Sequence, residues 1–174
     1  METLSDELLI QHAATGDAAS FSLLVRRHQS KVRGFLRRLA RGDAALADDL
    51  AQDTFFEAWR KIAQYRAEGS FAGWLCGIAW SRFLMNRRKR QEEPLEDVDV
   101  AASFDPSLGH AAKLDLEKAL ARLAVPERAA LTLCYALGHS HSEAAEILGL
   151  PLGTVKSHVL RGREKLQAML ETSP

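Results

Sequence analysis

Hydrophobic residues recur at spacings of three and four along almost the whole chain, which is the period that places them on one face of an α-helix. Gly, Pro and polar runs interrupt this pattern, and no stretch alternates as a half-buried strand does. We therefore predict an all-α protein of two small helical domains joined by a flexible acidic linker. The predicted helices cover about residues 6–14, 17–39, 44–65, 71–90, 114–124, 126–138, 142–148 and 153–170.

The last two predicted helices form a helix-turn-helix pattern. Ser142 can cap the short first helix, Gly149 ends it, and Pro151 separates it from a second helix that begins near Gly153. In DNA-binding proteins with this pattern, the second helix lies in the major groove. The alternative is an ordinary amphipathic helix whose polar side is only solvated, but the spacing of the whole pattern favours DNA reading.

The second helix of this pattern divides into two faces at 100° per residue. Its predicted buried stripe comprises Val155, Val159, Leu166, Met169 and Leu170. Arg, Ser and Lys on the opposite face can bond bases or neutralise phosphates. That face comprises Thr154, Ser157, Leu160, Arg161 and Glu164, with Lys156, His158 and Lys165 at its flanks.

The predicted helix 44–65 carries acids, an amide and an aromatic ring opposite its apolar stripe. The apolar stripe comprises Ala47, Leu50, Ala51, Phe55, Ala58, Trp59 and Ile62. An exposed Phe among polar groups is typical of protein interfaces, so the opposite face is a candidate surface for a partner. That face comprises Asp49, Gln52, Asp53, Phe56 and Arg60. The pattern alone gives equal support to a Phe56 that folds back onto a neighbouring helix.

The predicted helix 71–90 combines aromatic rings with cations. We expect Phe71, Trp74, Leu75, Ile78 and Met85 on its core side, and Trp80, Phe83, Arg87 and Arg88 on its other side. Rings can stack on unpaired bases while cations follow the phosphates. The alternatives are cations that favour the helix C-terminus and aromatics that pack on another helix. Arg82 falls near the apolar stripe, and a cation at that position is evidence against this assignment of the two faces.

The net charge of zero conceals an uneven distribution. Residues 1–90 carry 15 Lys and Arg against 10 Asp and Glu, residues 91–112 carry none against 6, and residues 113–174 carry 8 against 7. We therefore predict domains at 1–90 and 113–174, joined by an acidic linker at 91–112. The linker is either a passive tether or an acidic strap that folds over the basic faces and suppresses DNA binding when no partner is present.

Composition argues against several other classes of protein. The chain has no run of eighteen apolar residues and no basic-then-apolar leader, so we expect a cytoplasmic protein without membrane insertion. Cys134, His139 and His141 lie close in sequence but lack the paired spacing of a structural zinc site. No phosphate-binding loop or nucleophile motif stands out, so we expect no enzyme activity, no metal and no cofactor.

Two sets of motifs resemble the sigma-70 family of bacterial RNA polymerase sigma factors. Four segments resemble conserved region 2: Ala47–Phe55, Ala58-Trp59, Gly69–Phe71 and Trp74-Leu75. Three segments resemble region 4: Pro126–Arg128, Ala144–Gly149 and Gly153–Ser157. With only these two regions and a short linker, the chain is similar to the extracytoplasmic-function (ECF) group. The resemblance implies a factor that binds core RNA polymerase, recognises the minus-35 and minus-10 elements and helps to melt promoter DNA.

The resemblance also implies which residues make these contacts. Core polymerase would be bound at its clamp helices by Asp49, Leu50, Gln52, Asp53 and Phe56, with Leu50 and Phe55 as internal support. The minus-10 strand would be bound by Arg66, Ser70, Phe71, Trp80, Ser81, Arg87 and Arg88. Region 4 would dock on the polymerase flap and read the minus-35 element through Thr154, Lys156, Ser157, His158, Leu160 and Arg161. An anti-sigma protein is a further expected partner, because the group commonly uses one.

Four positions depart from the family's pattern. Many members have Asn in place of Ser81, a basic residue in place of Gly77, Arg in place of His158 and an aromatic in place of Leu160. These departures bear on the promoter sequence that is preferred and leave the general function unchanged.

Two other classes of protein stay open. A free-standing helix-turn-helix repressor or activator explains residues 113–174, but not the faces of the helices at 44–65 and 71–90. A sigma-like decoy that binds only proteins is opposed by the intact face from Thr154 to Arg161. Binding to duplex DNA without polymerase would favour the repressor, whereas promoter opening only with core polymerase would favour the sigma factor.

Overall fold

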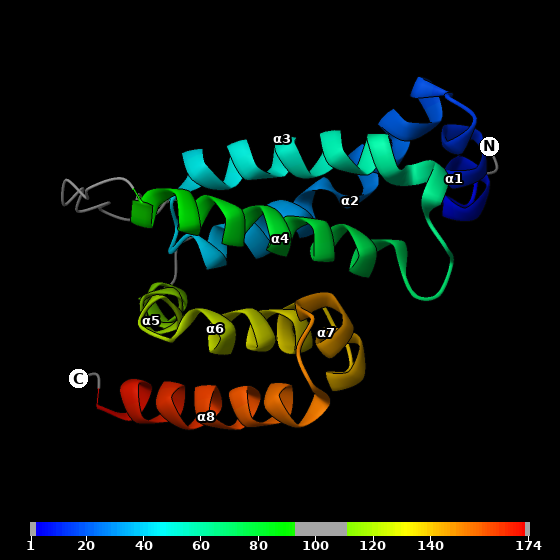
Figure 1. Ribbon diagram of the computed structural model, residues 1–174. Coiled ribbons are helices and arrows are strands. Elements are labelled where there is room, and N and C mark those ends of the chain that lie inside the picture. Colours follow the sequence, from blue (N-terminus) through cyan, green and yellow to red (C-terminus); the bar gives the residue numbers. More distant parts are fainter. Residues whose placement is uncertain (1–2, 93–110, 173–174) are drawn as a thin grey trace.

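The computed structural model describes residues 3–92 and 111–172, and every regular element in these ranges is helical (Figure 1). The N-terminal unit comprises α1 (Asp6–Ala14), α2 (Ala18–Leu39), α3 (Ala44–Lys61, continued by a 3-10 turn at Ile62–Gln64) and α4 (Phe71–Glu92). The C-terminal unit comprises α5 (Ala111–Ala121), α6 (Val125–Leu131, continued by a π-helical turn at Thr132–Ala136), α7 (His141–Leu148) and α8 (Leu152–Glu171).

The predicted all-α fold is confirmed. Within the described ranges, no helix is both long enough and apolar enough to cross a bilayer. The predicted acidic strap falls almost entirely on residues 93–110, which lie outside the described part of the chain.

Side chains at the helix starts explain where several helices begin. Ser5, Asp17 and Asp43 each accept a backbone N–H from the first turn of α1, α2 and α3. Ser140 caps α7 in a capping box with Glu143. The prediction that Ser142 caps this helix is wrong, because Glu143 stands three residues after Ser140 and the two side chains together satisfy two backbone N–H groups.

In the N-terminal unit, α2, α3 and α4 pack on one another, with α1 against α2 (Figure 1). The apolar stripe predicted for α3 is confirmed: Ala47, Leu50, Ala51, Ala58 and Ile62 are buried, and Phe55 and Trp59 are half-buried. The core of this unit therefore follows the hydrophobic period of its helices.

The predicted faces of α4 are partly wrong. Met85, expected in the core, is 56% exposed, whereas Trp80 and Phe83, expected outside, are 7% and 4% exposed. Arg82 lies near the apolar stripe because its guanidinium donates to the Glu57 carboxylate of α3 at 2.8 Å. Apolar residues lie on two sides of α4, so their period did not identify a single buried face.

In the C-terminal unit, α8 packs closely on α6. A Cβ added at Gly162 would lie 2.7 Å from Cδ1 of Leu131, so the glycine allows the two helices to approach. Nearer the end of α8, the Lys165 ammonium donates to the Glu127 carboxylate of α6 at 2.9 Å. These two contacts fix the direction in which α8 leaves the turn after α7.

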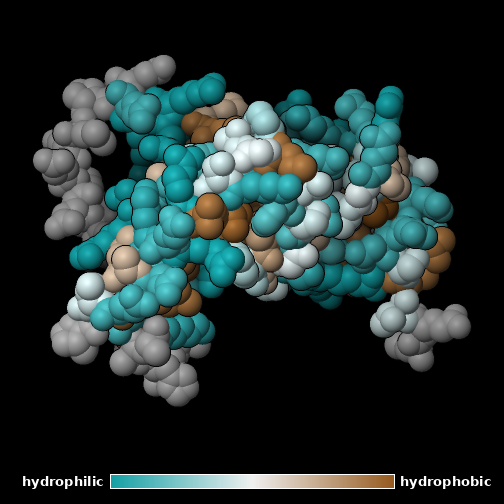
Figure 2. All heavy atoms as spheres, turned by 90° about the horizontal axis from the view of Figure 1, so that it is seen from below, coloured by the Kyte–Doolittle hydropathy of each residue, from teal (hydrophilic) through white to brown (hydrophobic). Residues whose placement is uncertain are grey.

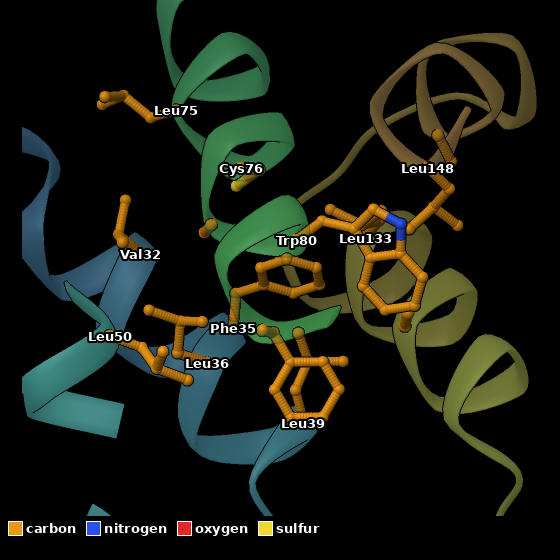
Figure 3. Close-up of a cluster of buried hydrophobic side chains, with 14 of the residues drawn as sticks. Val32, Phe35, Leu36, Leu39, Leu50, Leu75, Cys76, Trp80, Leu133 and Leu148 are labelled. Atoms are coloured by element: carbon orange, nitrogen blue, oxygen red, sulfur yellow. The ribbon is translucent and has the colours of Figure 1, made fainter. Parts of the chain in front are cut away.

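The two units also pack against each other, α4 against α7 and α2 against α5 and α6. Arg128 of α6 is only 1% exposed. Its guanidinium donates to the carbonyls of Ala121 and Leu123 in its own unit. It also donates to the Leu39 carbonyl at the end of α2, at 2.9 Å. One cluster of buried apolar side chains runs through both units, and Figure 3 shows Phe35, Trp80 and Leu148 within it.

Candidate nucleic-acid and protein interfaces

The predicted division of α8 into a buried and an open face is confirmed. Val155 and Val159 are buried, Leu166 and Met169 are half-buried, and Leu170, predicted in the same stripe, is 42% exposed. On the opposite face Lys156, Ser157, Leu160 and Arg161 are exposed, while Thr154 and His158 are half-buried. Seen from the side of α8, the surface is mainly hydrophilic with small apolar spots (Figure 2).

Hydrogen bonds within α8 organise the polar groups of its open face. The Ser157 hydroxyl donates to the Gly153 carbonyl at 3.0 Å, and Arg161 Nε donates to the Ser157 carbonyl at 3.4 Å. Arg161 Nη2 lies 3.5 Å from His158 Nδ1. Burial, and then the charge of Arg161, lowers the pKa of His158, so its imidazole is neutral at pH 7 and its Nδ1 can accept from Arg161.

The turn before α8 holds this open face away from the body of the protein. Gly149 ends α7 with φ 64°, a left-handed conformation that glycine adopts without steric cost, as the sequence predicted. Pro151 then precedes the first turn of α8, which begins at Leu152. The short helix, glycine turn and long helix reproduce the arrangement of a helix-turn-helix motif.

The face predicted on α3 is exposed as a whole. Asp49, Gln52, Asp53 and Arg60 are exposed, and Phe56 is 65% exposed. The alternative in which Phe56 folds back onto a neighbouring helix is therefore wrong. Leu50 lies beneath this face with 3% exposure and supports it from the core.

A shallow hollow of about 390 Å³ lies beside the α3 face, between α2 and α3. Phe21, Phe55 and Trp59 contribute apolar walls to it, and Gln52 and Phe56 stand at its edge. The rings of Phe21 and Trp59 pack at 5.0 Å, which stiffens this wall. A hollow with apolar walls and polar lining residues such as Gln52 and Arg33 offers both hydrophobic contact and hydrogen bonding to a protein partner.

The loop before α4 is ordered by its own hydrogen bonds. The Tyr65 hydroxyl donates to the Gly69 carbonyl at 3.1 Å, and Ser70 Oγ accepts from the Gly73 amide at 3.0 Å at the start of α4. Arg66 and Ser70 are exposed. Phe71 is only 6% exposed, because its ring packs against His28, Tyr65 and Trp74.

On α4 the predicted DNA-contact residues divide into open and covered ones. Ser81, Arg87 and Arg88 are exposed, whereas Trp80 is buried between α4 and the C-terminal unit, where it extends toward Leu133 and Leu148 (Figure 3). A cleft of about 820 Å³ runs between α4 and α7. Its walls include Arg66, Ser70, Trp74, Trp80 and Ser81 from one unit and His139, Glu143 and Ile147 from the other.

Of the three residues weighed as a zinc site, His139 makes a structural contact. The His139 imidazole lies 3.1 Å from the Glu143 carboxylate, one turn into α7. Hydrogen bonds from His139 and Ser140 lower the pKa of Glu143. Across the described ranges, no group of three or more His, Cys, Asp or Glu side chains is placed to hold a metal ion.

Sequence reasoning did not identify two polar residues that hold helices together, Glu57 and Arg128. Glu57 is 8% exposed and binds Lys61 at 2.9 Å as well as Arg82 of α4. The sequence held one signal for the Glu57 contact. Arg82 lies near the apolar stripe of its helix, and a cation there needs an acid on a neighbouring helix as its partner. Nothing in the sequence pattern around Arg128 indicated that its guanidinium reaches across to α2.

Comparison with known families identifies both units. Sigma-70 region 2 matches residues 24–93, and Sigma-70, region 4 matches residues 113–166. The ECF RNA polymerase sigma factor SigE of Mycolicibacterium smegmatis is 40% identical over 169 residues, which cover 90% of this chain and 65% of that relative's length. The ECF RNA polymerase sigma-E factor of Escherichia coli K12 is 32% identical over 184 residues, which cover 95% of this chain and 94% of the relative.

Two solved structures resemble this protein over both units. The sigma factor RpoE in complex with the anti-sigma factor NepR from Bartonella quintana has a TM-score of 0.74 at 30% identity, covering 88% of this chain and 98% of that one. CnrH in complex with the cytosolic domain of CnrY has a TM-score of 0.73 at 28% identity, covering 97% and 99%. The protein therefore belongs to the sigma-70 family, in the ECF group of sigma factors that direct promoter-specific transcription initiation by RNA polymerase.

Proposed function

We propose that this protein joins core RNA polymerase through α3 and acts on promoter DNA through α8 and α4. The observation that carries the proposal is that one chain presents two exposed faces of different chemistry, acidic and aromatic on α3 and polar and cationic on α8. A free-standing repressor would need only the polar and cationic face of α8. The functional domains are assigned to residues 1–90 and 113–174 around the linker at 91–112, and the site of action is the cytoplasm.

The α3 contact is assigned to Asp49, Gln52, Asp53 and Phe56, with Leu50 as support from the core. Phe56 is the hydrophobic anchor, since 65% of its surface is available for burial against the polymerase clamp helices. The two carboxylates and the amide around it supply charge and hydrogen bonds that fix the orientation of the complex. Chemistry on the nucleotides belongs to the polymerase, and this chain contributes binding energy alone.

The α8 contact is assigned to the minus-35 element. Arg161 can donate two hydrogen bonds to one guanine edge, and Lys156 is placed to neutralise a phosphate. Ser157, Thr154 and neutral His158 add shorter polar contacts, while Leu160, 57% exposed, offers an apolar contact to a thymine methyl group.

The minus-10 contact is assigned to the loop before α4 and to α4 itself. Arg66, Ser70, Ser81, Arg87 and Arg88 are open and can meet phosphates or a base directly. Phe71 supports the loop from within. Trp80 can stack on a base only after the C-terminal unit has moved away from it.

An anti-sigma protein is the third proposed partner. One solved relative described above is a sigma factor bound to an anti-sigma factor, and the other is CnrH bound to the cytosolic domain of CnrY. The likeness to each covers both units of this chain. A partner of this kind would compete with polymerase for the exposed face of α3 or the surface of the C-terminal unit.

The α3 assignment is tested by binding to bacterial core RNA polymerase. We expect Gln52→Ala plus Asp53→Ala to weaken binding by about fivefold or more, since two polar contacts at an interface contribute about 1 kcal/mol or more together. The matched control is Glu7→Ala plus Gln11→Ala, which removes an exposed acid and an exposed amide from α1. Fluorescence anisotropy of the labelled protein measures the affinity.

Equal affinity of both double variants would remove α3 as the main contact. Failure of the folded wild type to bind polymerase, together with tight binding to duplex DNA alone, would replace the sigma function by that of a repressor. Far-UV circular dichroism of each variant separates these results from a loss of helix.

A further inference from the structure

The loop of residues 66–70, between the 3-10 turn and α4, is exposed along its whole length. The Tyr65 hydroxyl donates to the Gly69 carbonyl, and the Glu68 amide donates to the Arg66 carbonyl at 2.7 Å. An exposed loop with so little packing of its own keeps one shape only when the chain on both sides of it is fixed. The contacts at its two ends therefore decide how it is presented to DNA.

Four aromatic rings pack together where the loop joins the helices. The Phe71 ring, at the start of α4, lies 5.5 Å from the Tyr65 ring and 5.4 Å from the Trp74 ring, centre to centre. It also meets the His28 imidazole of α2 edge to face at 5.3 Å. Because Tyr65 precedes the loop and Phe71 follows it, this ring cluster holds both ends of the loop, and His28 joins it to α2.

Helix α1 sets the orientation of the His28 ring. His28 is 9% exposed, and its Nε2 lies 2.6 Å from Oδ2 of Asp6, the first residue of α1. An ionised carboxylate can only accept, so Nε2 carries the hydrogen of this bond. The other ring nitrogen, Nδ1, is buried and has no hydrogen-bond partner among the described residues. The bond to Asp6 is therefore the polar contact that fixes the angle at which His28 meets Phe71.

The Asp6 carboxylate is ionised at neutral pH. Burial opposes ionisation, but hydrogen bonds from Arg27 and His28 outweigh it and lower the pKa of Asp6. Asp6 also lies close to the loop, since burial and then the charge of Asp6 raise the pKa of Tyr65. Helix α1 itself packs on the 3-10 turn at Ile62–Gln64, directly before the loop (Figure 1).

We propose that Asp6 and His28 are positioning residues for minus-10 recognition, through which α1 holds the loop of residues 66–70 in the shape that receives a base. The effect passes from the Asp6 carboxylate to the His28 ring, from there to Phe71, and so to the ends of the loop. Neither residue has to touch DNA. The consequence for recognition rests on the function proposed above, whereas the anchoring of the loop concerns the free protein alone.

Trypsin cleavage after Arg66 measures how firmly the loop is held, because the backbone around this exposed residue must open to enter the protease. We expect Asp6→Ala and His28→Phe to accelerate this cleavage of the free full-length protein by about tenfold or more, since each removes a hydrogen bond to a charged group. His28→Phe keeps an aromatic ring against Phe71, so the packing stays while the bond is lost. Mass spectrometry of the fragment 1–66 measures the rate.

Three further variants separate this bond from the rest of α1. Asp6→Asn keeps an oxygen that can accept from Nε2–H, and it should return the rate to within about threefold of the wild type. Arg27→Ala removes the other partner of the carboxylate, and Glu7→Ala removes an exposed acid from the same helical turn. Both should leave the rate within about twofold of the wild type, because exposed ion pairs and lone surface charges contribute little.

A combined variant tests whether the two residues act as one unit. Asp6→Ala plus His28→Phe should be cut no faster than either single variant, because both changes remove the same bond. Acceleration confined to Arg66, with the other trypsin sites cut at the wild-type rate, distinguishes a loosened loop from a destabilised protein. Effects of the two changes that multiply would show that Asp6 and His28 act separately, which contradicts the proposal.

The second test measures recognition by the complex with core polymerase. Permanganate footprinting compares promoter opening on one promoter and on its single-base variants in the minus-10 element. We expect Asp6→Ala and His28→Phe to reduce the preference for the best base by about fivefold or more, and Asp6→Asn to retain it, because a displaced loop no longer matches one base. Affinity for core polymerase should stay unchanged, since the exposed face of α3 is intact.

Unchanged cleavage after Arg66 in both Asp6→Ala and His28→Phe would overturn the anchoring of the loop. Faster cleavage with the full base preference retained would overturn its part in recognition. A wild-type complex without any base preference in the minus-10 element would refute the proposed function instead. The cleavage rates, measured without polymerase or DNA, would still decide whether Asp6 and His28 hold the loop.

Discussion

His158 shows how one side chain of α8 can make DNA recognition depend on pH. Its imidazole faces Arg161 on its own helix and Glu127 on α6; burial and Arg161 lower its pKa, and Glu127 acts in the opposite direction. The lowered pKa keeps His158 neutral at pH 7. Protonation therefore occurs only below the ordinary value of 6.5.

We predict that affinity for the minus-35 duplex, measured with the polymerase complex, stays flat from pH 8 to 7 and rises by a few-fold as the pH falls below 6.5, because protonated His158 adds one cation near the phosphates. His158→Gln should abolish this rise. Arg161→Ala should weaken binding at every pH, since its guanidinium is charged throughout. A rise that survives in His158→Gln would show that another group titrates.

At the scale of the helix, the packing of α8 on α6 depends on the absence of a side chain at Gly162. We predict that Gly162→Ala destabilises the protein by about 1–3 kcal/mol, because the new methyl group would lie 2.7 Å from Leu131, itself packed in the core. Gly34→Ala is the matched control. Its Cβ would meet nothing within 4 Å, so it should stabilise α2 by about 0.5–1 kcal/mol through helix propensity.

Urea unfolding of both variants measures these effects. The two substitutions add the same methyl group to helical positions, so their opposite signs isolate the close approach of α8 to α6. A stabilising Gly162→Ala would mean that Leu131 moves aside without cost.

The contrast between α8 and α4 explains what the sequence could predict. Helix α8 borders the protein along one side, so Val155 and Val159 fall on a single stripe and the open face could be named residue by residue. Helix α4 is covered on two sides. Its apolar residues therefore follow no single stripe, and Trp80 and Phe83 were assigned to the surface while Met85 was assigned to the core.

Two contacts that the sequence did not reveal each join one helix to another. Arg82 meets Glu57 on the preceding helix, and Arg128 meets the Leu39 carbonyl 89 residues away. Periodicity describes the faces of one helix and contains no information on which faces meet. The candidate polymerase and minus-35 faces were predictable because they need only exposure, whereas the covering of the minus-10 face depends on tertiary packing.

At the scale of the whole protein, the shared core predicts how the protein unfolds. One buried cluster includes Phe35 and Trp80 of the N-terminal unit and Leu133 and Leu148 of the C-terminal unit. We therefore expect the wild type to unfold in one cooperative transition. A Cβ at Gly77 of α4 would lie 3.8 Å from the Ile147 carbonyl of α7, so Gly77→Glu places a charged side chain between the units and should make them unfold in two transitions.

The positions of the aromatic residues allow this to be measured without labels. All three Trp residues lie in the N-terminal unit, whereas both units contribute to the far-UV helix signal. Urea curves followed by Trp fluorescence and by circular dichroism should coincide in the wild type and diverge in Gly77→Glu. Divergent curves in the wild type would show that the two units fold independently.

The Arg38–Glu117 pair has a consequence for the way the protein responds to salt. It joins α2 to α5 at 3.2 Å, with about a quarter of each side chain exposed. An ion pair of this exposure contributes about 0.2–1 kcal/mol, and dissolved salt screens it. Concentrated salt should therefore weaken the attachment of α5 to α2, whereas screening leaves the apolar contacts between the two units unchanged.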